Sequence, residues 1–163
     1  CTMSYEITYR NAVSVDDDIA LAVEMMKKLC IYQKMDDTSM INDDNMRKLL
    51  ADDAGKGIFA YIDGKPVAFM YYYYNYPMLI GCKCMYIDCL YIEEEYRHSG
   101  VGSDFLSYIA KHALEEGCRR IEWLCLTWNI PALKMYDKVG AKTMDTVSLH
   151  RVDHETMIKL ADK

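Results

Sequence analysis

The sequence predicts an α/β (α+β) fold, and three observations carry that prediction. Two β-rich runs, 57–62 and 66–74, flank an Asp63-Gly64 pair, which is typical of a β-hairpin. An apolar strand at 84–92 leads through a glycine-containing turn into a helix. Other segments carry apolar residues at helical spacing, so strands and helices are expected to mix along the chain.

The first part of the chain predicts one strand and two helices. Residues 5–10 alternate apolar and polar side chains, as a half-buried strand does. The acidic run 16–18 is expected to cap a helix that ends near 32–35, and a second helix is expected from Asn42. The carboxylates of Asp36, Asp37, Asp43 and Asp44 fit either a cation site or a solvated loop with a helix cap.

The last part predicts a helix at 101–116, closed by Gly117 in a left-handed conformation, and then a strand at 120–126. Asn129-Ile130-Pro131 starts a short helix, because proline suits a first turn. A final strand is expected within 143–152, followed by an amphipathic tail at 155–162. Nothing in residues 1–163 divides the chain, so a single domain is expected.

Composition narrows the class of protein. The net charge is −6 and no Lys or Arg cluster could follow a nucleic-acid backbone, so neither nucleic acid nor an anionic membrane is an expected partner. No segment is apolar enough to span a bilayer, and no secretory leader is recognisable. The seven cysteines have no metal-ligand spacing and are expected to be reduced thiols. A soluble, cytoplasmic protein without a metal follows.

The chain is organised around the strand, turn and helix at 86–113. The turn reads Arg97-His98-Ser99-Gly100-Val101-Gly102-Ser103, and backbone N–H groups at a helix N-terminus favour an anion. Glycine lets a phosphate approach the backbone closely, which is the expected reason for Gly100 and Gly102. The spacing matches neither the dinucleotide nor the triphosphatase pattern. We therefore expect a pyrophosphate-binding loop of another kind.

This turn, with the strand before it, resembles the acyl-CoA signature of the GCN5-related N-acetyltransferases (GNAT). The segment from Leu126-Thr127-Trp128-Asn129 to Val139-Gly140-Ala141 is similar to a second signature of that family. The resemblance covers nearly the whole chain. It implies a GNAT fold with a central mixed, mostly antiparallel sheet of six to seven strands and helices on both faces.

Within the family, the chain looks most like the diamine (spermidine/spermine and thialysine) N-acetyltransferases. Those enzymes tend to carry glutamate where this chain has Gln33, and aspartate before the proline where it has Asn75-Tyr76. The matching position for Asp88 is usually glutamate. A primary amine of a small molecule is the implied acceptor, although two missing carboxylates disfavour a long polyamine. The implied partners are this amine and a second copy of the chain, because relatives commonly pair as homodimers through C-terminal strands.

The resemblance also implies a set of site residues. For the co-substrate acetyl-CoA these are Leu90, Tyr91, Ile92, Arg97, His98, Ser99, Gly100, Val101, Gly102, Ser103, Asn129, Ala132 and Tyr136. For the amine they are Tyr32, Gln33, Asp36, Asp37, Tyr72 and Asp88. Tyr136 occupies the position that donates a proton to the departing thiolate, and Asp88 is the expected base or cation anchor.

The chemistry requires such a base. A primary alkylamine with a pKa of about 10 is protonated at neutral pH, and an ammonium has no lone pair with which to attack a thioester. Asp88 is expected to take the proton, directly or through a water. Strand alternation is expected to turn Cys89 away from Asp88, and no covalent intermediate is needed. Two alternatives stay open, namely a peptide or protein N-acetyltransferase and a non-catalytic acyl-CoA-binding sensor.

Overall fold

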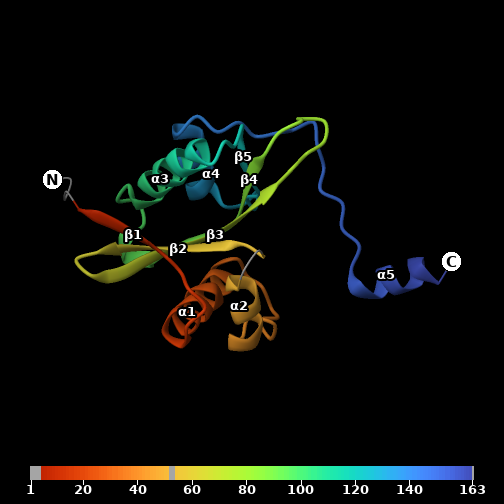
Figure 1. Ribbon diagram of the computed structural model, residues 1–163, viewed down its shortest axis with the longest axis horizontal. Helices are drawn as coiled ribbons and strands as arrows, with labels where there is room; N and C mark the ends of the chain where they lie inside the picture. Colours follow the sequence, from red (N-terminus) through yellow and green to blue (C-terminus); the bar gives the residue numbers. More distant parts are fainter. Residues whose placement is uncertain (1–4, 52–53, 163) are drawn as a thin grey trace.

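A five-stranded sheet with helices on both faces forms the body of the protein (Figure 1). The computed structural model describes residues 5–51 and 54–162. The strand order is β1-β2-β3-β4-β5, antiparallel except for the parallel pair β4 and β5, so the predicted α/β class and mixed sheet are confirmed. The elements in order are β1 (Ile7–Asn11), α1 (Asp16–Tyr32), α2 (Asp43–Leu50), β2 (Lys56–Ile62), β3 (Lys65–Asn75), β4 (Cys84–Ile92), the 3₁₀ helix η1 (Glu94–Tyr96), α3 (Val101–Glu115), β5 (Ile121–Trp123), α4 (Ile130–Lys138) and α5 (His154–Ala161).

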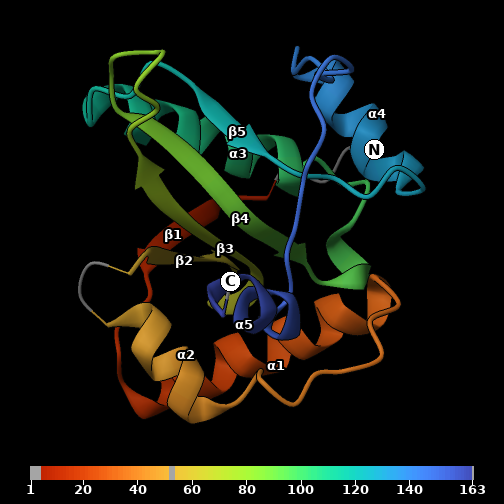
Figure 2. The ribbon, with the colours of Figure 1, turned by 90° about the vertical axis from the view of Figure 1, so that its right-hand side faces the viewer.

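Two hydrophobic cores hold the layers together. Helices α1 and α2 cover one face of the sheet, and α3 and α4 lie on the other (Figures 1 and 2). Phe59 and Phe69 pack in the first core, whereas Ile58 and Met70 pack in the second. This alternation along β2 and β3 is what a sheet covered on both faces requires. Each fully buried side chain of this size contributes about 1.5–3 kcal/mol.

Several local signals give the structures they predict. The hairpin between β2 and β3 turns at Asp63 and Gly64, whose φ angles of 49° and 75° suit a tight turn between twisted strands. The Asn42 side chain accepts a hydrogen bond from the Asn45 backbone N–H at 3.0 Å and caps α2. Gly117 follows α3 with a φ of 76°, as predicted.

The start of α1 differs from the prediction. Its N-cap is Val15, which has no side-chain oxygen, so the acidic run does not cap the helix. Asp18 is instead buried and binds Arg10, with Arg10 Nη2 2.7 Å from Asp18 Oδ1. The Asp18 carboxylate also accepts a hydrogen bond from the Val13 backbone N–H. This ion pair ties the first strand to the first helix.

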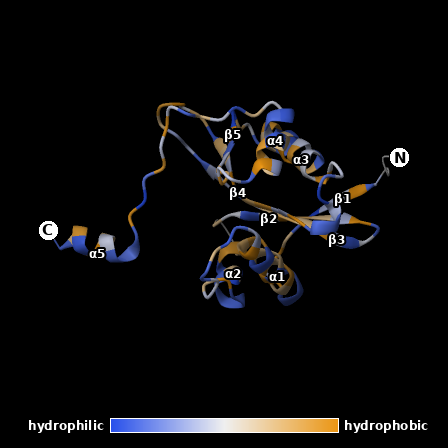
Figure 3. Ribbon diagram, turned by 180° about the vertical axis from the view of Figure 1, so that it is seen from behind, coloured by the Kyte–Doolittle hydropathy of each residue, from blue (hydrophilic) through white to orange (hydrophobic). Residues whose placement is uncertain are grey.

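The predicted six to seven strands are not all present, because the described residues form five. Strand β5 is shorter than the expected 120–126, and the segment 143–152 forms no strand. That segment runs away from the body and leads to α5, which stands apart from the sheet (Figures 1 and 3). A strand needs a neighbouring edge for its backbone hydrogen bonds, and this segment lies beside none. The expected C-terminal helical tail is present as α5.

Candidate active site

A cleft of about 860 Å³ opens where β4 and β5 separate. The pairing of these parallel strands ends at Ile87 and Trp123, after which the two backbones diverge. The end of α1 borders the cleft, opposite the start of α4. The predicted site residues that line it are Tyr32, Gln33, Asp88, Leu90, Tyr91, Ile92, Arg97, His98, Gly100, Gly102, Ser103, Asn129, Ala132 and Tyr136.

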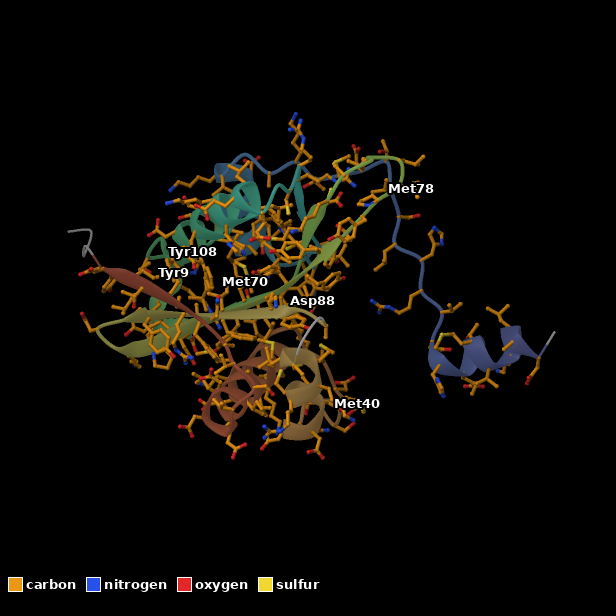
Figure 4. The ribbon with its side chains drawn as sticks, viewed as in Figure 1. Tyr9, Met40, Met70, Met78, Asp88 and Tyr108 are labelled. Carbon is orange, nitrogen blue, oxygen red and sulfur yellow. The ribbon has the colours of Figure 1, made fainter. Side chains whose placement is uncertain are left out.

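Asp88 owes its position to a β-bulge in β4. Tyr71 of β3 pairs with Cys89 and Tyr72 pairs with Ile87, which leaves Asp88 as an extra residue. A bulge bends the strand and redirects a side chain. Here it directs Asp88 into the cleft, in the middle of the molecule (Figure 4).

The surroundings of Asp88 favour its protonated form. Partial removal from water raises the pKa of this carboxyl above its usual range. Its charge in turn helps to raise the pKa values of Tyr71 and Tyr73, for which burial is the larger cause. The residues predicted from the sequence included Tyr72 instead of these two tyrosines. The bulge places Asp88 on the same face of the sheet as Tyr71 and Tyr73, and a bulge is not visible in the sequence.

Tyr136 lies on α4, at the wall of the cleft opposite β4. Its ring packs against Trp123 with the centroids 5.1 Å apart. Burial, followed by the neighbouring Cys125 and Tyr32, raises the pKa of Tyr136 to about 12. Its hydroxyl therefore stays protonated at every physiological pH.

Asp88 and Tyr136 line the cleft and also share one small cavity. This cavity has a volume of about 20 Å³ and is also lined by Leu90 and Trp123. A space of about 10–15 Å³ suffices for one water molecule. The structure thus brings the predicted base and the predicted acid, which are far apart in the sequence, into the lining of one water-sized space.

Cys89 also lines this cavity, contrary to the prediction that it points away from Asp88. The alternation on which that prediction relied is interrupted by the bulge. Burial, followed by the charge of Asp88, raises the pKa of the Cys89 thiol to about 12. The thiol donates a hydrogen bond to Met26 Sδ at 3.4 Å. Because the thiolate is the nucleophile, this cysteine is poorly suited to covalent catalysis.

The predicted anion-binding loop connects η1 to α3. Gly100 is the N-cap of α3 with a φ of 97°, a conformation that only glycine adopts readily. Gly102 lines the cleft, and close packing is a second reason for glycine there, because a Cβ would lie 2.4 Å from Met135 Sδ. The N–H groups of the first helical turn have no intrahelical partner and remain available to an anion.

Positive charge gathers around this loop. Arg97 and His98 line the cleft, as predicted, and so do Lys134 and Lys138 of α4. The two lysines were missed, although they lie four residues apart and therefore on one face of a predicted helix. Although the chain has a net charge of −6, the cationic side chains of Arg97, Lys134 and Lys138 thus line the cleft together with the loop expected to bind phosphate.

Some predicted residues lie elsewhere. Tyr72 is buried against α3, where its hydroxyl hydrogen-bonds with His112 Nε2 at 3.0 Å, so it does not face an amine. Asp36 and Asp37 are exposed and do not line the cleft, and Asp37 accepts a hydrogen bond from the Ser39 N–H in a solvated loop. The side chain of Val101 is buried in the core. Ser99 is exposed and does not border the cleft.

The described residues contain no group of three or more His, Cys, Asp or Glu side chains that could hold a metal ion. The six cysteines among them are free thiols. Within the same part of the chain, no helix has the length and apolar character needed to cross a bilayer.

Comparison with known proteins identifies a family match and several relatives of this chain. Residues 24–141 match the acetyltransferase (GNAT) family. Thialysine N-epsilon-acetyltransferase from Sus scrofa is 28% identical over 164 residues, covering 91% of this chain and 94% of that protein. L-ornithine N5-acetyltransferase from Arabidopsis thaliana is 28% identical over 117 residues, covering 72% of this chain and 48%, about half, of the plant protein.

Solved structures show the same fold at lower identity. An integron cassette protein from V. cholerae superimposes with a TM-score of 0.78 at 20% identity, covering 96% of this chain and 98% of that one. A predicted acetyltransferase from Clostridium acetobutylicum, solved with acetyl-CoA, has a TM-score of 0.71 at 19% identity, with 90% and 96% of the two chains covered.

Proposed function

The chain belongs to the acetyltransferase (GNAT) family, and on that premise we propose that it transfers the acetyl group of acetyl-CoA directly to a primary amine of a small molecule. One observation carries the proposal: a carboxylate, Asp88, and a protonated phenol, Tyr136, line the same water-sized cavity as well as the cleft. The anion-binding loop lies along that cleft. The relatives named for thialysine and ornithine act on small amines, which supports the same class of acceptor here.

The residues present fit acetyl-CoA. The loop at 97–103 would hold the pyrophosphate through backbone N–H groups at the start of α3, with Arg97, Lys134 and Lys138 supplying positive charge. The backbone of Leu90 to Ile92 would pair with the amides of the pantetheine arm. On the side that faces β5, this stretch of β4 has no partner strand within residues 5–51 and 54–162, because the β4–β5 pairing ends at Ile87. Asn129 would contact the same arm.

The co-substrate supplies a thioester, and the side chains move the protons. Asp88 accepts a proton from the ammonium through the water-sized cavity, which frees the nitrogen lone pair to form the new C–N bond. A backbone N–H near Leu90 stabilises the negative charge that develops on the carbonyl oxygen. As the C–S bond breaks and its electron pair goes to sulfur, Tyr136 donates its phenolic proton to the thiolate. The nitrogen loses its second proton to solvent as the amide forms, and solvent also takes the proton from Asp88 and returns one to Tyr136, so that one proton is released overall.

The amine would enter from the side of α1. Asp88 and Gln33 both line the cleft there, so one carboxylate and one amide face the incoming cation. With Asp36 and Asp37 outside the cleft, no second carboxylate is available from that loop for a distant ammonium group. A short amine with a single reactive ammonium therefore suits the site better than a long polyamine.

The same proposal includes a homodimer. The C-terminal segment 142–162 is exposed throughout, yet it carries the apolar residues Met144, Val147, Leu149, Val152, Met157, Ile158 and Leu160. Exposed apolar residues also occur at the β3–β4 turn, where Met78 stands at the tip (Figure 4), and after β5. Apolar surface on this scale marks an interface, and a second copy would cover it. Sedimentation equilibrium tests this: Val147→Asp should weaken the dimer, whereas a wild-type chain that stays monomeric contradicts it.

We also propose a cytoplasmic location, since the described cysteines are free thiols and a reducing compartment keeps them so.

A panel assay tests the activity itself. Diamines, polyamines, lysine analogues, aminoglycosides and peptides are each incubated with acetyl-CoA, and acetylated product is measured by mass spectrometry. We expect turnover on one class of small primary amine, with Asp88→Asn strongly impaired on it. Turnover on peptides alone would indicate a peptide acetyltransferase, and acetyl-CoA binding without turnover on any amine would indicate a sensor.

A further inference from the structure

Tyr32, at the last residue of α1, contacts both walls of the cleft. Its hydroxyl lies 3.0 Å from Asn129 Oδ1, at the start of α4. The guanidinium carbon of Arg97, in the anion-binding loop, lies 4.7 Å from the centroid of its ring. Arg97 is itself held by a hydrogen bond from its Nε to the Ile92 backbone carbonyl at 3.0 Å. One side chain of the acceptor-side helix thus touches the two elements expected to hold acetyl-CoA.

The contact to Asn129 has a defined direction. Asn129 Oδ1 also accepts a hydrogen bond from the Ala132 backbone N–H at 3.4 Å, as the N-cap of α4. A peptide N–H can only donate, so the oxygen of the Asn129 amide must face the helix. The Tyr32 hydroxyl must then donate to the same oxygen. Because both donors are directed at Oδ1, the NH₂ group of Asn129 is free to donate into the cleft that this residue lines.

We propose that Tyr32 is a positioning residue for acyl-CoA binding: by donating to Asn129 Oδ1 it holds the side-chain NH₂ of Asn129 ready to donate to a carbonyl of the pantetheine arm. This inference rests on the proposed function, and it moves Tyr32 from the predicted amine site to the acyl-CoA site. The pantetheine arm contains two amides, each with a carbonyl oxygen, so a fixed NH₂ donor matches its chemistry. A freely rotating Asn129 would have to be ordered on binding, which costs affinity.

The substitution Tyr32→Phe isolates the hydroxyl, because the ring that contacts Arg97 stays. Asn129→Ser removes the NH₂ donor and keeps a neutral residue suited to capping α4. Tyr108→Phe is the matched control, since Tyr108 stacks on Tyr9 at 4.0 Å, away from Asp88 (Figure 4). Each variant and the Tyr32→Phe/Asn129→Ser double variant are titrated calorimetrically with acetyl-CoA and with adenosine 3′,5′-bisphosphate, which carries no pantetheine arm.

We expect Tyr32→Phe to raise the Kd for acetyl-CoA by about three- to tenfold, the net value of one hydrogen bond. The double variant should bind acetyl-CoA within about twofold of Asn129→Ser alone, because Tyr32 then has no NH₂ group to hold. Binding of adenosine 3′,5′-bisphosphate should change in none of the variants. At saturating acetyl-CoA, kcat of Tyr32→Phe should equal that of the wild type, as a role confined to binding requires.

Three results would overturn the inference: an unchanged Kd for acetyl-CoA in Tyr32→Phe, an equal weakening of adenosine 3′,5′-bisphosphate, or additive losses in the double variant. Each leaves the proposed function intact, provided that the wild type binds acetyl-CoA and acetylates an amine. A wild-type protein that binds no acetyl-CoA would instead refute the proposed function.

Discussion

Replacing Tyr136 by phenylalanine tests the proton donor while preserving the packing around it. The aromatic ring that packs 5.1 Å from Trp123 is retained, so only the hydroxyl is lost. Because the pKa of this hydroxyl is about 12, the wild-type enzyme keeps its acid protonated across the whole usable pH range. The loss caused by the substitution should therefore be the same at every pH tested.

The size of that loss follows from the leaving group. General acid catalysis contributes about 10²- to 10⁴-fold to a rate. A thiol with a pKa near 8.5 leaves as a moderately stable thiolate, so it needs less help than an alkoxide does. We expect the lower end, a fall in kcat of about 100-fold, which corresponds to about 2.7 kcal/mol in the activation barrier. The KM for acetyl-CoA should stay within about threefold, since the hydroxyl acts in the transition state.

The assay follows acetylated amine by mass spectrometry, using the best amine from the panel, over a series of pH values. Tyr108→Phe is the control for a tyrosine hydroxyl outside the cleft, and circular dichroism checks that each variant is folded. A folded Tyr136→Phe enzyme that keeps more than about a third of the wild-type kcat at every pH would show that another group protonates the thiolate.

The remaining predictions concern the base, the glycine turn and the first ion pair. Because the pKa of Asp88 is raised, kcat/KM should fall as the pH drops through this pKa, where protonation removes the base. Asp88→Asn should abolish this decrease of kcat/KM at low pH. A decrease that survives in the variant would implicate another group. Gly102→Ala should lower the free energy of unfolding by about 1 kcal/mol in urea titrations, because its Cβ would lie 2.4 Å from Met135 Sδ, while the flexible methionine side chain and the helix propensity of alanine offset part of the cost. Adding Met135→Ala should make the Gly102→Ala substitution cost less, and an unchanged cost would contradict this cause. Asp18→Asn should cost about 1.5 kcal/mol, the low end for a charged hydrogen bond because Arg10 is half-exposed. The hydrogen bond from Arg10 is the main reason that the pKa of Asp18 is lowered in the folded protein. This stabilisation is therefore complete above the unfolded-state pKa of about 3.9 and is lost as the pH falls through the lower folded-state pKa. Equal loss of stability at low pH in the wild type and in Asp18→Asn would refute this role of Asp18.

Features that depend on a few neighbouring residues were predictable from the sequence. The turn at Asp63-Gly64, the helix starts at Asn42 and Asn129, and the left-handed Gly117 after α3 formed as expected. Their chemistry is local, because a cap or a left-handed turn is decided by residues a few positions apart. The same holds for the anion-binding loop, whose backbone N–H groups follow from the start of the helix itself.

The sequence alone therefore predicts the order of the elements as far as α4, together with the loop expected to bind phosphate. Which residues come together in the cleft depends on how the strands pair in three dimensions. The bulge in β4 brings Asp88 and Cys89 to the same cavity and, by shifting the pairing with β3, places Asp88 on the side of Tyr71 and Tyr73 rather than on that of Tyr72. Such a register shift depends on pairing between strands, and a displacement of one residue reverses which face each side chain takes. For the same reason, residues 143–152 had the composition of a strand without forming one, because a strand exists only where another edge pairs with it.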